Sequence, residues 1–374
     1  MRVTVLTSSR ADFGIQLPLL RALQGSPRFQ PSVVAFGSHA DPRYGNTIDE
    51  VLAAGFDMAA VLPPVLEQDD PAGIALAMAR TTEQFARFWH DHPTDLVVAL
   101  GDRYEMFAAV AASLPFGLPI AHLHGGETTL GAIDNAMRHA ITHMATLHFT
   151  CAEPYRQRVV RMIGTEAGVY DTGALGLDNL RTMEFLSVPA IRDRFGVDMS
   201  KPTVLITLHP ETRSAGEAGA QWAEVEAALR PLAQRYQLLV TLPNADTHGS
   251  AIRIRWQRLL ATMSNAVGLD SLGSRGYLSC MRHCAFMLGN SSSGYVEASF
   301  FPKPVIDIGE RQTGRIVTPN IRRVPFDASA ILAAVSVIEQ APATYGSAPG
   351  IYGDGHAAER MLRIMEYLPG RWIP

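Results

Sequence analysis

The stretch IALAMARTTEQFARFWHDHPTDLVVALGD, residues 74–102, contains the pattern that decides the fold. Residues 74–92 carry apolar side chains at helical spacing and predict an amphipathic helix. Residues 96–100 are then uniformly apolar, which is typical of a strand buried on both faces. A long helix followed by a short buried strand is the repeating unit of a parallel sheet with crossover helices.

The same alternation extends in both directions from this stretch. A polar segment at 188–202 interrupts it, so we place a boundary near residue 190. The sequence therefore predicts two doubly wound α/β domains, residues 1–187 and 188–354, followed by a terminal helix within 355–374. The other predicted strands are 3–9, 31–38, 58–64, 119–126, 147–152 and 169–174 in the first domain, and 203–210, 237–244, 265–272, 286–293 and 304–310 in the second.

The composition excludes several classes of protein. The chain has 374 residues, of which 47% are hydrophobic and 18% charged, as expected for a globular protein with buried elements. The net charge is −4 and no basic run occurs, which argues against nucleic acid or an anionic membrane surface as a partner. No segment has the ~18 uncharged apolar residues of a membrane span, and MRVTVLTSS is too short and strand-like for a signal peptide.

The three cysteines are too few, and odd in number, for a disulfide framework. Sparse cysteine fits a reducing compartment, so we expect a cytoplasmic protein. Cys280 and Cys284 could supply half of a zinc site, but no second pair lies nearby in the sequence. The simpler interpretation is that both are small buried residues.

Polar residues collect directly after the predicted strands. The segments concerned are SSRADFG (8–14), GDRYE (101–105), HLHGGE (122–127), LHPET (208–212) and GNSSSG (289–294). Because the carboxyl ends of parallel strands meet at one edge of a sheet, these segments predict ligand sites at that edge.

The segment GNSSSG offers hydroxyls and backbone N–H groups at a predicted helix start, which suits a phosphate. The alternative is that the serines only cap the helix. Glu297 follows one turn later and is a candidate acceptor for ribose hydroxyls. His209, in LHPET, is either a structural histidine or a residue for phosphate contact and proton transfer. The G-K-[ST] of a P-loop is absent, so ATP hydrolysis is not supported.

The stretch 122–149 holds five histidines and suggests a zinc site. His139 and His143 have the spacing of a zinc-binding helix, but Ala140 stands where a metalloprotease has Glu. The acids Glu127 and Asp134 instead favour acid and base chemistry, and Asp134 is also a candidate helix N-cap.

Several of these motifs together resemble one family. SRADFG, GDRYE, HLHGGE with IDNAMRHAIT, TGALGLDN, GNSSSGYVEAS and IGERQTGR are similar to those of the hydrolysing UDP-N-acetylglucosamine 2-epimerases, including bacterial enzymes of the sialic and legionaminic acid pathways. The resemblance runs from about residue 3 to residue 320.

The resemblance implies a GT-B fold, in which two facing Rossmann-like domains form the active site in their cleft. The first domain would act on the sugar, the second would bind UDP, and the C-terminal helix would pack back on the first domain. The implied reaction, part of nonulosonic acid biosynthesis, converts UDP-N-acetylglucosamine and water to N-acetylmannosamine and UDP. It proceeds by anti elimination to a 2-acetamidoglucal and then hydration, without cofactor or metal. The implied partners are a UDP-sugar and further copies of the chain, in a homodimer or homotetramer.

The resemblance also assigns residues. Several relatives have a second Asp at the position of Asn135, and the animal enzyme has Glu at that of His124. The expected catalytic residues are Asp102, His124, Glu127, Asp134 and His209, and the expected substrate contacts are Arg10, Arg103, Asn244, Ser291, Ser292, Ser293, Gly294, Glu297 and Arg311.

Three alternatives remain open at this point. The first is the same reaction on UDP-2,4-diacetamido-2,4,6-trideoxyglucose, in which the groups at C4 and C6 differ. The second is a GT-B glycosyltransferase, and the third is a UDP-sugar sensor without turnover. The acids Asp102, Glu127 and Asp134 argue against both of these, because neither has a use for acid and base groups around C2 of the sugar.

Overall fold

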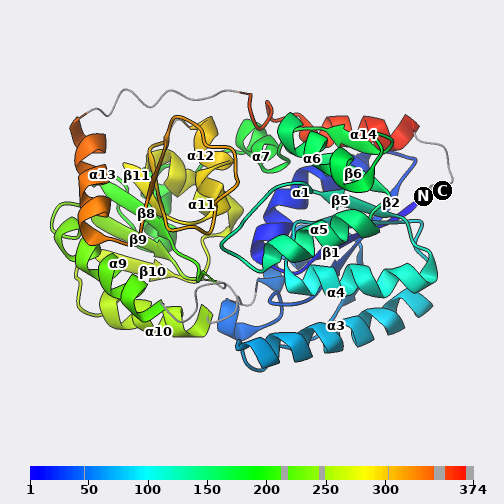
Figure 1. Cartoon of the computed structure of the whole chain (residues 1–374), viewed down its shortest axis with the longest axis horizontal. Helices are drawn as coiled ribbons and strands as arrows, with labels where there is room; N and C mark the ends of the chain where they lie inside the picture. The colour runs from blue at the N-terminus through cyan, green and yellow to red at the C-terminus, as the bar shows by residue number, and fades with distance from the viewer. Residues whose placement is uncertain (46, 212–217, 244–248, 302, 341–349, 368–374) are drawn as a thin grey trace. The chain divides into compact units, whose positions relative to one another are not determined.

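Two α/β units, each with its own parallel sheet, form the computed structural model of the chain (Figure 1). The structure describes residues 1–374 except 46, 212–217, 244–248, 302, 341–349 and 368–374. The predicted α/β class with two doubly wound sheets is confirmed. The first unit comprises Met1–Glu127, Asp134–Thr182 and Gly350–Pro374, and the second Thr128–Ile133 and Met183–Pro349.

In the described part of the first unit, seven parallel strands lie in the order β3-β2-β1-β4-β5-β6-β7. The strands are β1 (Arg2–Thr7), β2 (Gln30–Ala35), β3 (Met58–Val61), β4 (Leu96–Leu100), β5 (Ile120–Leu123), β6 (Leu147–Thr150) and β7 (Val169–Asp171). The helices are α1 (Arg10–Gly25), α2 (Ile48–Ala53), α3 (Pro71–Asp91), α4 (Tyr104–Ser113), α5 (Asp134–Met144), α6 (Glu153–Ile163), α7 (Gly176–Thr182) and α14 (Ala357–Tyr367). Asp134, expected as the N-cap of this helix, is instead the first residue of α5.

Strand β4 shows why the strands of this unit are continuously apolar. Leu96, Val98 and Leu100 enter a core with residues of α1 and α14, whereas Val97 and Ala99 enter another with residues of α3 and α4. Successive strand residues point to opposite faces, and helices cover both. The strand pattern of the sequence therefore follows from burial on two sides.

The second unit repeats this topology. Within its described residues, six parallel strands lie in the order β10-β9-β8-β11-β12-β13. The strands are β8 (Thr203–Thr207), β9 (Gln237–Thr241), β10 (Ala266–Leu269), β11 (Phe286–Gly289), β12 (Val305–Ile308) and β13 (Ile321–Val324). The helices are α8 (Val188–Phe195), α9 (Ala218–Leu232), α10 (Gly249–Leu260), α11 (Gly273–His283), α12 (Glu297–Phe300) and α13 (Ala328–Gln340).

Strand β13 is absent from the sequence-based prediction. It lies at the edge of its sheet, and the exposed Arg322 and Arg323 interrupt its apolar run. An edge strand tolerates exposed charge, which removes the signal that marks a buried strand.

Both sheets have a point where the strand order reverses. It lies between β1 and β4 in the first unit and between β8 and β11 in the second. Loops at the carboxyl ends of the strands diverge there, which leaves space for ligands. These two loop clusters hold most of the predicted site residues.

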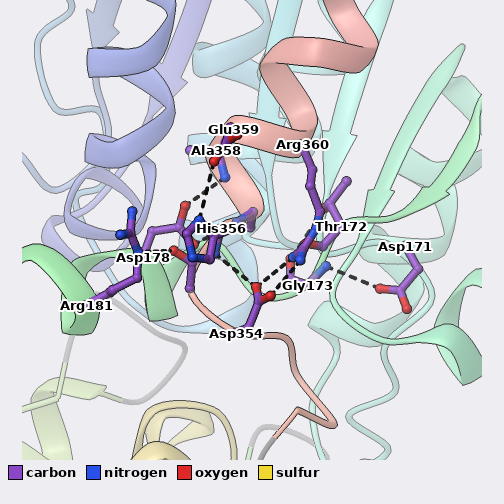
Figure 2. Close-up of polar contacts among 12 residues, drawn as sticks. Asp171, Thr172, Gly173, Asp178, Arg181, Asp354, His356, Ala358, Glu359 and Arg360 are labelled. Carbon is purple, nitrogen blue, oxygen red and sulfur yellow. Dashed lines mark hydrogen bonds and ion pairs between the residues drawn. The ribbon is translucent and has the colours of Figure 1, made fainter.

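The chain returns to the first unit at its C-terminal end, where α14 packs against α1 and α7. Figure 2 shows the polar contacts of this segment. Both carboxylate oxygens of Asp178 accept hydrogen bonds from the start of α14, one from Ala357 N at 2.9 Å and one from Ala358 N at 2.7 Å. Arg360 donates to Asp354 and to the carbonyl oxygen of Thr172. An acid capping a helix start thus fixes the return of the chain.

Cys280 and Cys284 are both buried, and burial raises the pKa of each thiol to about 12. Both are therefore protonated residues of the interior. Among the described residues, no helix combines the length and apolarity needed to cross a bilayer.

The cap on α14 gives a stability prediction. Replacing Asp178 by Ala leaves two buried N–H groups without their acceptors, which we expect to cost about 1–3 kcal/mol of local stability. Hydrogen–deuterium exchange at the amides of α14 measures this loss directly. Asp193→Ala, at an exposed position of α8, is the matched control and should change exchange little. Unchanged exchange in α14 of the Asp178 variant would contradict the capping role.

Candidate active site

In the first unit, polar side chains follow four neighbouring strands. Ser8 and Ser9 come after β1, Asp102 after β4, His124 after β5 and Cys151 after β6. Because β1, β4, β5 and β6 are consecutive in the sheet, their carboxyl ends bring these loops to one edge.

Arg138, on α5, is the central cation of this edge. Its side chain is buried, and it forms an ion pair with the carboxylate of Asp102. Its Nη1 donates to the carbonyl oxygen of His124 at 2.8 Å and lies 3.6 Å from Oε2 of Glu127. One guanidinium therefore joins the loops after β4 and β5 and balances two acids.

Glu127 is held from its other side as well. Nδ1 of His124 lies 3.1 Å from its Oε1, and the Cys151 thiol donates to the same oxygen with a sulfur–oxygen distance of 3.0 Å. Glu127 is 1% exposed. It is thus a buried acid with partners at both oxygens.

The backbone at His124 is in an unusual conformation. Its φ of 62° lies in the left-handed region, which non-glycine residues rarely adopt. Its N–H donates to the carbonyl oxygen of Phe149 at 2.9 Å, and its own carbonyl oxygen accepts from Arg138. Such strain costs about 1–3 kcal/mol and persists where surrounding contacts impose it, often at functional sites.

A second buried network surrounds Arg103. Its Nη2 lies 3.0 Å from Oε1 of Glu105, which is itself buried. Burial raises the pKa of Glu105 and of Asp12, while the Arg103 charge acts in the opposite direction on both. Asp12 also accepts hydrogen bonds from Ser8 N and Oγ. These contacts orient Arg103 at the edge of the sheet.

Two other histidines of the stretch 122–149, His122 and His148, are buried within strands β5 and β6. Both ring nitrogens of His122 have partners, Gly101 O at 2.8 Å and Thr142 Oγ1 at 3.2 Å, and burial lowers its pKa to about 3. Burial also lowers the pKa of His148 to about 4. Both rings are therefore neutral near pH 7 and pack in the protein interior.

Among the residues that the structure describes, one group of side chains could hold a metal ion, and it is His124, Glu127 and Cys151. His139 and His143, the pair with zinc spacing, do not belong to it. The atoms of the group already satisfy one another as hydrogen-bond partners, and Arg138 places a positive charge beside Glu127. Repulsion by that charge weakens the site for a cation.

Two more predicted residues lie on helix starts of the first unit. Asp134 is the first residue of α5 and is half-buried, one helical turn before Arg138. Residues four apart share one helix face, so Asp134 and Arg138 lie on the same side of α5. Arg10 is the first residue of α1, directly after Ser8 and Ser9.

In the second unit, Asn290 positions His209. The side-chain Oδ1 of Asn290 accepts from His209 N at 2.8 Å, and its Nδ2 donates to His209 O at 3.0 Å. The backbone oxygen of Asn290 accepts in turn from Arg311 Nη1 at 3.1 Å and Gln312 Nε2 at 2.7 Å. The carboxyl ends of β8 and β11 are thus tied together by one buried amide.

The serine-rich segment forms a short turn instead of a long helix. Ser292–Gly294 is a 3-10 turn capped by Ser291, and α12, with Glu297 at its start, has four residues. Tyr277 OH lies 2.6 Å from Ser293 Oγ, which lies 2.9 Å from Ser291 Oγ. The hydroxyls therefore form a chain, in addition to the cap that Ser291 provides.

Arg311 is held at its backbone by a buried acid. Glu211 Oε1 accepts from the N–H groups of Glu310 at 2.6 Å and Arg311 at 3.0 Å. Gly309 is required beside it, because a Cβ there would lie 2.2 Å from that oxygen. Asn244, also expected in the site, lies outside the described residues.

The sequence alone did not identify the residues that support the site. Arg138 and Asn290 stand inside motifs used for the family resemblance, but nothing in the sequence marks which partner each has. No sequence pattern assigned a role to Cys151. Contacts between loops that are distant in sequence carry no periodic signal.

Comparison with known proteins agrees with this architecture. The family model described as UDP-N-acetylglucosamine 2-epimerase matches residues 21–366. A UDP-N,N'-diacetylbacillosamine 2-epimerase (hydrolyzing) of Legionella pneumophila is 31% identical over 368 residues, which cover 98% of this chain and 96% of the relative. The corresponding GDP/UDP-N,N'-diacetylbacillosamine enzyme of Campylobacter jejuni is 33% identical over 323 residues, covering 86% and 83%.

The fold also has a close match among solved structures. The UDP-GlcNAc 2-epimerase of Neisseria meningitidis, bound to UDP-GlcNAc, aligns with a TM-score of 0.83 at 17% identity and covers 98% of this chain and 100% of its own. The predicted GT-B fold class is confirmed. The chain therefore belongs to the UDP-N-acetylglucosamine 2-epimerase family and is an enzyme of its hydrolysing branch.

Proposed function

We propose that the chain hydrolyses a UDP-linked 2-acetamido sugar with inversion at C2 and releases UDP. Elimination of UDP across C1 and C2 gives a 2-acetamidoglucal, to which water then adds. The C2 proton has no adjacent carbonyl to acidify it, so the elimination needs a well-placed base and a stabilised leaving group.

The observation that carries this proposal is the cluster of the buried His124, Glu127 and Arg138 with the partly exposed Asp102. Two acids and an imidazole around one guanidinium are suited to moving protons in a site from which water is excluded. Asp134, on the same helix as Arg138, is the further acid that we assign to the proton transfers. A protein that only binds UDP-sugars gains nothing from these groups.

We assign the nucleotide to the second unit. His209 and Arg311 provide groups suited to pyrophosphate, and Glu297 is suited to ribose hydroxyls. The groups that can donate to phosphate are the hydroxyls of Ser291, Ser292 and Ser293 and the backbone N–H of Gly294. Arg10 and Arg103, both in the first unit, and Asn244 remain predicted substrate contacts. We further expect a cytoplasmic homodimer or homotetramer acting in nonulosonic acid biosynthesis.

Two sugars are candidate substrates. The relatives at 31% and 33% identity carry the name of UDP-N,N'-diacetylbacillosamine, a 2,4-diacetamido-2,4,6-trideoxy sugar, and favour that substrate. UDP-N-acetylglucosamine is the second candidate, favoured by the family description and by the ligand of the Neisseria structure. A pocket built for one set of groups at C4 and C6 discriminates strongly against the other.

The substrate prediction is tested by incubating the protein with each UDP-sugar in deuterated water. We expect UDP release together with a 2-epimerised sugar carrying deuterium at C2, because the returning proton comes from solvent. Mass spectrometry and proton NMR detect both products. Release of UDP from neither sugar would refute the epimerase proposal, and the ratio of kcat/KM values identifies the substrate.

A second prediction concerns metals. Treatment with EDTA should leave turnover unchanged, because the Arg138 charge opposes a cation beside Glu127. The measurement is UDP release before and after chelation, with zinc added back as the control. Loss of activity that zinc restores would instead assign a metal to His124, Glu127 and Cys151.

The role of Asp134 gives a third prediction. Asp134→Asn should lower kcat by about 10²- to 10⁴-fold, the range for loss of a general acid or base, while UDP still binds. Asp193→Asn, on the exposed face of α8, is the control and should retain full turnover. Full activity of Asp134→Asn would remove Asp134 from the proton-transfer set.

A further inference from the structure

Glu127 and His124 are side chains in contact with each other, and they differ in how accessible each is to a substrate. Oε1 of Glu127 is engaged by His124 and Cys151, and Oε2 faces the guanidinium of Arg138. Glu127 is 1% exposed and His124 9%. A substrate proton can therefore reach the His124 ring more readily than the Glu127 carboxylate.

The contacts of Glu127 decide the state of the ring. A nearby guanidinium and two hydrogen-bond donors favour the ionised carboxylate, which accepts but does not donate. Nδ1 of His124 must then carry the proton in the bond to Oε1. In the neutral ring, Nε2 is left as an acceptor with a lone pair.

Nε2 of His124 is buried and has no hydrogen-bond partner among the described residues. A buried polar atom without a partner is rare in folded proteins and calls for a functional explanation. A substrate group that approaches this atom would supply the missing partner.

The ring is also held in place by its backbone. The left-handed φ at His124 is fixed by hydrogen bonds at both its N–H and its carbonyl oxygen. With Nδ1 bound to Glu127, three separate contacts determine where Nε2 points. This degree of preorganisation suits a group that acts on a substrate.

We propose that Nε2 of His124 removes the C2 proton of the sugar, that Glu127 positions the ring, and that Cys151 positions Glu127. The inference rests on the proposed elimination. The Nε2 lone pair takes the proton, the C2–H electron pair forms the C1=C2 double bond, and the C1–O bond breaks with its pair on the departing UDP. The Glu127 carboxylate then stabilises the imidazolium.

The role of Cys151 follows from its hydrogen bond to Glu127. Its buried thiol donates to the oxygen of Glu127 that also accepts from His124. It thereby limits rotation of the carboxylate and lowers the negative charge on that oxygen.

Nitrogen-15 NMR of labelled histidine tests the tautomer without any need for turnover. In the intact chain at neutral pH, we expect His124 to show a protonated Nδ1 and an unprotonated Nε2, with His124→Gln used to assign the signals. A ring protonated at Nε2 alone would overturn the proposal.

Kinetics test the proton transfer itself. His124→Gln should lower kcat by about 10²- to 10⁴-fold, because the variant has no imidazole to accept the C2 proton. UDP binding, measured by calorimetry, should be unchanged and shows that the variant is folded. Turnover by His124→Gln at the unmodified rate overturns this inference alone, whereas absence of turnover by the unmodified protein overturns the proposed function as well.

Cys151 variants test the positioning role. Cys151→Ala should lower kcat about tenfold with little change in KM, because one hydrogen bond to a charged group is lost. Cys151→Ser retains a donor and should restore most of the rate, while Cys280→Ala, a matched change of a buried cysteine in α11, should have no effect on kcat. A purely structural role would lower the folded fraction and leave kcat per folded molecule unchanged.

Discussion

The ion pair between Arg138 and Asp102 holds together the polar edge of the first unit's sheet. A buried guanidinium is costly unless acceptors surround it, and here they come from the ends of β4 and β5. Without this charge, Asp102 and Glu127 would be two acids brought together with no compensating cation. The position of α5 therefore determines the charge balance of this edge. Arg138, on α5, supplies the cation that stabilises the two carboxylates.

In the second unit, a neutral side chain connects the loops at the ends of neighbouring strands. The side-chain oxygen and nitrogen of Asn290 both bond to the backbone of His209. The backbone carbonyl oxygen of Asn290 accepts hydrogen bonds from Arg311 and Gln312. The same strand order puts this amide beside β8, as it puts Asp102 beside β1. One topology thus presents two kinds of site: a charged cluster suited to proton transfer, and a set of donors and hydroxyls suited to an anion.

Much of the fold could be predicted from the sequence because buried helices and strands produce regular patterns of apolar residues. Strands such as β4, covered by helices on both faces, read as continuous apolar runs. Strand β13 has no such apolar run, because its arginines are exposed at the edge of the sheet. The short segment Thr128–Ile133 belongs to the second unit although Glu127 and Asp134 on either side belong to the first. A segment of that length has no periodicity from which its partner could be inferred.

The sequence by itself determined the fold class, the family and the residue types of the site, because these depend on local pattern and on motifs contiguous in the chain. Only the tertiary structure decided which ring nitrogens have partners: both nitrogens of His122 are occupied, whereas Nε2 of His124, like Nδ1 of His139 and Nδ1 of His148, has no partner among the described residues. It also decided that Cys151 and Arg138 share Glu127. The physical reason is that hydrogen bonding, burial and charge compensation depend on distances between loops that lie far apart in sequence.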